Sequence, residues 1–160
     1  MQNKEPQASN FSALVDAIVS ASVGGHPVAK EQIGQLGATP QFLQKFGLPD
    51  LALGLKGKVI EKIVMDRGIP KSMVKRLAAI VAVPRAVCAS APPHHSGVVV
   101  LTFEVTGLGQ VMLSVAGSQS IGRSHTMNLV TSVYAKEDAR AFARWEADGL
   151  LLWKAKKHQP

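Results

Sequence analysis

The spacing of apolar residues changes near residue 85, and this change most constrains the fold. Before it, apolar side chains recur every three or four positions in FSALVDAIVSASV (11–23) and KVIEKIVMDRG (58–68), which is typical of amphipathic helices. After it, GVVVLTFEV (97–105) and QVMLSVAG (110–117) are β-rich runs joined by a turn that contains two glycines. Helices followed by strands predict an α+β fold, with N-terminal helices packed on a small, mostly antiparallel sheet.

The expected sheet has about four strands and one inserted helix. NLVTSVY (128–134) is the third strand and LLLWK the fourth, and helix 138–148, anchored by Phe142 and Trp145, lies between them. We expect the helices before the sheet to be capped or ended by Thr39, Gly24, Gly47, Gly68 and Pro84. We expect LPDLALGL to be an irregular or extended link. We expect one compact domain with these parts: a disordered tail (1–10), a helical lead-in with basic helices (11–84), the sheet with its helix (85–154) and a basic tail (155–160).

Charge is concentrated in one part of the chain. The net charge is +7, and residues 54–85 hold eight Lys or Arg against two acids. Such a segment favours a polyanion, so RNA or DNA is the expected partner, although solvated helix faces would also carry these lysines. The candidate nucleic-acid-binding residues are Lys58, Lys62, Arg67, Lys71, Lys75 and Arg76.

Several kinds of site are not indicated. The single cysteine, Cys88, excludes an intramolecular disulfide and a Cys-rich zinc site, and we expect it to be a packing residue. The adjacent pair His94-His95 does not suit a metal site, and no Gly-rich phosphate-binding loop is present, so we expect no metal and no cofactor. The chain has neither a recognisable secretion signal nor a run of about 20 apolar residues, so we expect a cytoplasmic protein without a membrane segment, with delivery by a signal-less route left open.

A polar row on the third strand is the candidate catalytic site. Strand alternation would place Asn128, Val130, Ser132, Tyr134 and Lys136 on one face, with Arg123 and His125 just before the strand. Metal-independent RNA cleavage needs a proton acceptor, a proton donor and groups that stabilise charge on the phosphorane. The expected catalytic set is His125, Ser132, Tyr134, Lys136, Arg123 and Asn128, and a solvated outer strand face is the other interpretation.

From about residue 33 to residue 154, the chain resembles the phage MuF C-terminal domain and related phage nucleases grouped with barnase, EndoU, colicin and RelE ribonucleases. The segments that carry the resemblance are GLPDLAL, VPRAV, and NLVTSVYAK followed by an aromatic-containing helix and GLLLW. The resemblance implies helices packed on a small antiparallel sheet, and a metal-independent RNase used as a phage- or plasmid-borne toxin. It places the functional positions at Asn128, Ser132, Tyr134, Lys136 and the helical Lys62.

The chain departs from the relatives at two positions. They carry a histidine where this chain has Arg67, and a glycine where it has Ala135. Arg67 stays protonated and cannot act as a general base, so either His125 has taken that role or the reaction has been lost.

Three functions are therefore open. The first is an RNase-like toxin or effector. The second is a non-catalytic descendant that binds a protein or nucleic acid, for example to inhibit a conjugation or secretion system, with an immunity or target protein as partner. The third is a helix-turn-helix DNA-binding protein built from residues 58–82.

Overall fold

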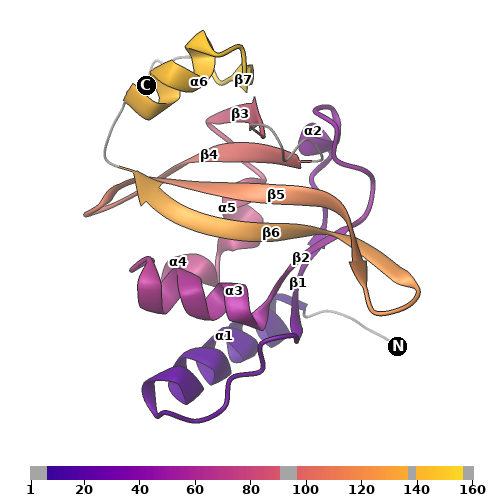
Figure 1. The fold of residues 1–160 in the computed structure, drawn as a ribbon, viewed down its shortest axis with the longest axis vertical. Helices are drawn as coiled ribbons and strands as arrows, with labels where there is room; N and C mark the ends of the chain where they lie inside the picture. The colour runs from indigo at the N-terminus through magenta and orange to yellow at the C-terminus, as the bar shows by residue number, and fades with distance from the viewer. Residues whose placement is uncertain (1–6, 91–96, 137–139, 157–160) are drawn as a thin grey trace.

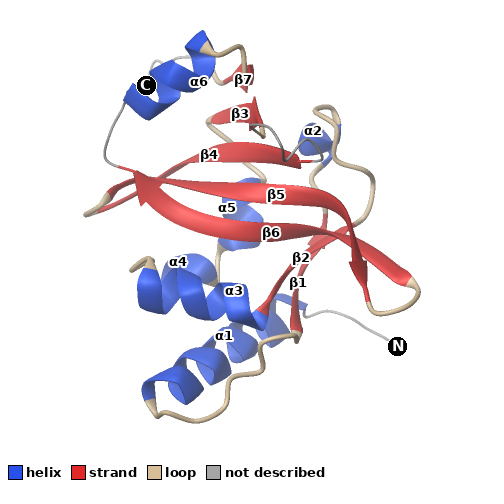
Figure 2. Ribbon diagram, viewed as in Figure 1, coloured by secondary structure: helices blue, strands red, loops and turns tan. Residues whose placement is uncertain are grey.

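The computed structural model describes residues 7–90, 97–136 and 140–156, in seven strands and a set of mostly short helices. Figure 2 shows them coloured by type. In chain order they are α1 (Gln7–Val23), β1 (Ile33–Ala38), α2 (Gln41–Gln44), β2 (Ala52–Lys56), α3 (Gly57–Glu61), the π-helix η1 (Lys62–Asp66), α4 (Lys71–Val74), α5 (Leu77–Val81), β3 (Ala86–Ala89), β4 (Gly97–Thr106), β5 (Gly109–Ile121), β6 (His125–Lys136), α6 (Arg140–Ala147) and β7 (Leu151–Lys154).

The strands form one sheet in the order β1-β2-β6-β5-β4-β3-β7. The β2–β6 pair is parallel and the other pairs are antiparallel. The α+β class is confirmed, but the prediction of about four strands was too low. The prediction missed β1, β2 and β3. Glycines interrupt the sequence IGQLGA of β1 and the ALGLKG stretch at β2, and the sequence AVCA of β3 is too short to show alternation.

The helices cover one face of the sheet. Figure 1 shows α1, α3 and α4 grouped beyond the β6 side of the sheet, with α5 behind it. The main core fills this layer, where Val15 of α1, Ile63 of η1 and Leu77 of α5 meet alternate residues of the central strands. A smaller apolar cluster lies on the opposite face around Cys88, Leu101 and Met112, and Trp145 of α6 packs against it. The sheet is therefore buried on both faces near β3 and β4.

Several helix boundaries differ from those expected. Helix α1 begins at Gln7, inside the stretch 1–10 predicted to be a disordered tail. The helix expected over 58–68 is α3 continued by a π-turn, and it stops where predicted, at Gly68, which has a positive φ of 70°. The helix expected after Pro70 is split into α4 and α5, which are separated at Lys75 and Arg76.

The remaining expectations concern Thr39, Phe142, the pair His94-His95 and membrane-spanning helices. Thr39 does not cap a helix: its hydroxyl donates a hydrogen bond to the Leu51 carbonyl at 2.6 Å. The side chain of Phe142 and the pair His94-His95 lie outside the described residues. Over the described parts of the chain, no helix combines the length and apolarity needed to cross a bilayer.

Candidate functional site

A β-bulge divides the polar row on β6. Ser132 pairs with Ser114 and Val130 pairs with Val115, which leaves Thr131 as an extra residue. Val130 lies in the main core, on the helix-covered face, whereas Tyr134 packs against the smaller cluster on the other face. The prediction that one face carries the whole row was therefore wrong, because the bulge reverses the alternation within the strand.

Asn128, on the far side of this bulge, is fully buried. Its amide nitrogen donates hydrogen bonds to the Thr39 hydroxyl at 2.8 Å and to the Pro49 carbonyl at 2.9 Å. Its side-chain oxygen accepts a bond from the backbone N–H of Ser118 at 3.1 Å. The amide thus connects three segments of chain and is not available to a ligand.

Arg123 and His125 lie at the opposite end of β6 from Lys136. Arg123 is exposed in the β5–β6 turn, and His125 is exposed and pairs with Ile121 next to that turn. Seven residues separate His125 from Ser132, which is roughly 20 Å along a strand. His125 and Arg123 therefore lie away from Ser132, Tyr134 and Lys136 along the strand.

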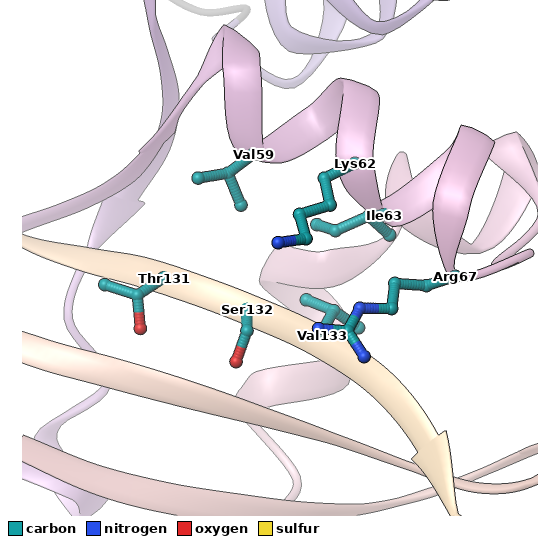
Figure 3. A pocket seen from close by; sticks show the side chains of 7 residues that line it. All are labelled: Val59, Lys62, Ile63, Arg67, Thr131, Ser132 and Val133. Atoms are coloured by element: carbon teal, nitrogen blue, oxygen red, sulfur yellow. The ribbon is translucent and has the colours of Figure 1, made fainter.

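A narrow groove lies between the α3–η1 helix and the outer edge of β6. The pocket in it measures about 50 Å³ and is lined by Val59, Lys62, Ile63, Arg67, Thr131, Ser132 and Val133. In Figure 3 the Lys62 and Arg67 side chains extend from the helix toward the strand, while the hydroxyls of Thr131 and Ser132 point away from Lys62. The groove therefore presents two cations and apolar walls.

The π-turn and the strand edge shape this groove. The backbone N–H of Arg67 donates a hydrogen bond to the Lys62 carbonyl at 3.0 Å, so the two cationic residues lie one helical turn apart on the same side. Strand β2 pairs with β6 only at Asn128 and Leu129. Among the described residues no strand pairs with the rest of that edge, so alternate backbone N–H groups face the groove.

Most of the other predicted nucleic-acid contacts are neutralised within the protein. The ion pairs join Lys71 and Lys75 to Asp16, Arg76 to Glu104, and Lys58 to Glu31. Lys62 and Arg67 form no ion pair with any described residue. Lys62 and Arg67 thus differ from the other four predicted contacts, each of which has a carboxylate partner.

Arg67 also connects the groove to the opposite face of the sheet. Its guanidinium carbon lies 5.9 Å from the centre of the Tyr134 ring, and the Lys136 ammonium lies 5.8 Å from the same centre. Burial raises the pKa of the Tyr134 phenol above its ordinary value, and the positive charge of Arg67 offsets part of that rise. The phenol therefore keeps its proton at neutral pH and can donate a hydrogen bond.

These groups suit an anion better than a nucleophilic reaction. Lys62, Arg67 and the edge amides are donors that match phosphate oxygens. The one cysteine is not a nucleophile here, because burial raises the pKa of the Cys88 thiol to about 11, and its predicted packing role is confirmed. The described residues contain no group of three or more His, Cys, Asp or Glu side chains placed to hold a metal ion.

Sequence reasoning identified Lys62, Arg67, Ser132, Tyr134 and Lys136, and the structure brings these five close to the β6 edge. Sequence reasoning did not identify the groove walls, Val59 and Val133, because an apolar residue on a helix or strand is assigned to the core by default. Nor did it identify Trp145 as a neighbour of Lys136. No local sequence signal marks the bulge that decides these neighbours.

Comparison with protein families finds a match over much of the chain. The model described as the phage MuF-C-terminal domain matches residues 58–160, more than half of the chain. The matched region includes η1, β6 and α6, and so every residue of the groove. No curated protein and no solved structure gives a significant match.

Proposed function

Because the chain belongs to the phage MuF C-terminal domain family, we propose that it is an effector domain of phage or plasmid origin whose groove binds the phosphate backbone of RNA. The observation that carries this proposal is the position of Lys62 and Arg67. They are cations without a carboxylate partner in the described structure, and the π-turn places both over a strand edge that lacks a pairing strand.

The environment of the two cations strengthens their attraction for phosphate. Val59, Ile63 and Val133 form apolar walls, which lower the local dielectric constant and so strengthen charge–charge interactions. At about 50 Å³ the pocket is far smaller than the roughly 300–1,000 Å³ of small-molecule sites. It therefore suits one projecting group of a larger ligand, such as a backbone phosphate, better than a whole metabolite.

The salt dependence of RNA binding tests this proposal. Each phosphate contact to a single strand contributes about 0.7 to the slope of log K against log salt, so Lys62→Ala/Arg67→Ala should lower the slope by about 1.4. Fluorescence anisotropy with a labelled RNA at several salt concentrations measures it. The matched control, Lys71→Ala/Lys75→Ala, removes the same charge from two lysines that share the Asp16 carboxylate, and should lower the slope less. Equal losses in the two variants would contradict a specific groove.

RNA cleavage is a second candidate, favoured by the contact between Arg67 and Tyr134. In such a reaction the 2′-oxygen attacks the phosphorus and its proton passes to water, while the bond to the 5′-oxygen breaks. The protonated Tyr134 phenol would supply a proton to the leaving oxygen and regain one from solvent. Lys62 and Arg67 would stabilise the charge on the phosphorane.

Tyr134→Phe separates cleavage from binding, because it removes the phenolic proton and keeps the ring. If the phenol is the acid, the variant should cleave RNA at least about 100-fold more slowly, with RNA affinity changed little. Gel analysis of RNA incubated with EDTA measures the rate. An unchanged rate in the variant, or no cleavage by the wild type, would eliminate this candidate and leave RNA binding as the function.

A further inference from the structure

Two aromatic rings and a lysine lie next to each other on the sheet face opposite the main core. The Lys136 ammonium is 5.8 Å from the centre of the Tyr134 ring and 5.9 Å from the Trp145 ring of α6. Both rings pack on the smaller apolar cluster, and both are only partly buried. The Lys136 ammonium thus lies over both partly exposed rings of the cluster.

This cluster is continuous with the phosphate-binding groove through Arg67. Arg67 and Lys136 each lie within 6 Å of the Tyr134 ring centre, so they are at most about 12 Å apart. Successive phosphates of one nucleic-acid strand can reach both cations across that distance. A strand with one phosphate at Arg67 would therefore bring a neighbouring nucleotide to Lys136 and its two rings.

We infer that Tyr134, Lys136 and Trp145 form a base-stacking subsite, and that the chain binds single-stranded RNA in preference to duplex RNA. The inference rests on the proposed function, since the groove must hold the adjacent phosphate. A positive groove beside aromatic rings is the combination that proteins use for single strands, because any unpaired base offers a π-face for stacking. In a duplex those faces are covered by neighbouring base pairs, so only the phosphate contacts remain.

Tryptophan fluorescence gives a direct readout, because the chain has two tryptophans and only one is in this cluster. Trp153 packs against Phe42, with 4.6 Å between the ring centres, and contacts the main core instead. A ten-nucleotide single-stranded RNA of mixed sequence should quench the emission of the wild type and of Trp153→Phe. In Trp145→Phe, where Trp153 is the only tryptophan, the same RNA should cause little quenching. A blunt-ended RNA duplex, which has no unpaired bases, should quench none of the three.

Affinities measured by anisotropy complete the test. The single strand should bind about 10-fold or more tightly than the duplex. Trp145→Leu should lower the affinity for the single strand about 10-fold while leaving the affinity for the duplex unchanged. If both RNAs bind equally, depend on Lys62 and Arg67, and leave Trp145 unquenched, the stacking subsite is refuted and the phosphate-binding groove stands. If no RNA binds, or if binding is independent of Lys62 and Arg67, the proposed function and this inference both fail.

Discussion

At the scale of single residues, Asn128 shows how a side chain expected in a catalytic site can be structural. Its amide forms hydrogen bonds with groups from the loop after β1, the loop before β2 and the bulge of β5. Ser118, whose backbone N–H donates a hydrogen bond to the Asn128 side-chain oxygen, has a positive φ of 53°. This conformation costs energy for any residue other than glycine. The Asn128 amide thus helps to hold a strained bulge beside the parallel pairing of β2 with β6.

Replacing that amide by the equally sized carboxylate should destabilise the protein strongly. Asn128→Asp removes both N–H donors and places a negative charge against the Pro49 carbonyl, so we expect a loss of about 3 kcal/mol or more in the free energy of unfolding. Urea titration measures it. Ser132→Ala on the same strand is the control, and should change stability by no more than about 0.5 kcal/mol. A stable Asn128→Asp variant would return Asn128 to the list of candidate ligand-binding residues.

At the scale of elements, Asp16 connects α1 to α4. Its carboxylate lies 3.2 Å from the Lys71 ammonium and 2.8 Å from that of Lys75. The hydrogen bonds from Lys75 and then Lys71 hold the pKa of the Asp16 carboxyl below its ordinary value of 3.8. A carboxyl with a lowered pKa in the folded protein stabilises the fold fully above its unfolded pKa, and loses this effect as the pH falls through the lower folded value.

We therefore expect Asp16→Asn to lower the melting temperature slightly at pH 7. The difference from wild type should shrink as the pH falls below the ordinary value of 3.8 and disappear only below the lower folded pKa. High salt should also reduce the difference, because the pair is exposed. Thermal unfolding followed by circular dichroism measures both effects. Asp66→Asn removes a charge from an exposed residue with no ion pair among the described residues and serves as the control. A difference that does not shrink as the pH falls below 3.8 would mean that Asp16 acts by some means other than its charge.

At the scale of the whole molecule, the layers decide which surface is left for a ligand. The main core joins α1, α3 and η1, α4 and α5 to one face of the sheet, and α6 covers part of the other face near β3 and β4. The β6 edge lies between these layers, with the groove on one side and the Tyr134 cluster on the other. Arg67 contacts both, so a single extended ligand can follow this edge from one layer to the other.

The sequence alone determined the elements whose signals are local. Apolar spacing identified α1, the α3–η1 helix and strands β4, β5 and β6, because side-chain alternation and helical periodicity require only near neighbours. Gly68 marked a helix end for the same kind of reason, since glycine adopts a positive φ at little cost. The basic segment and the residues Lys62, Arg67, Tyr134 and Lys136 were also recognisable from composition and order alone.

The tertiary structure decided everything that depends on contacts between distant residues. β1 and β2 are strands because they pair with each other and with β6, which their own glycine-containing sequences do not indicate. Asp16 neutralises lysines more than 50 residues further along the chain, and no spacing rule predicts which lysine finds a carboxylate. The bulge at Thr131 separated Asn128 from Ser132, because strand register depends on how the partner strand pairs, and one extra residue reverses which side chains face the core.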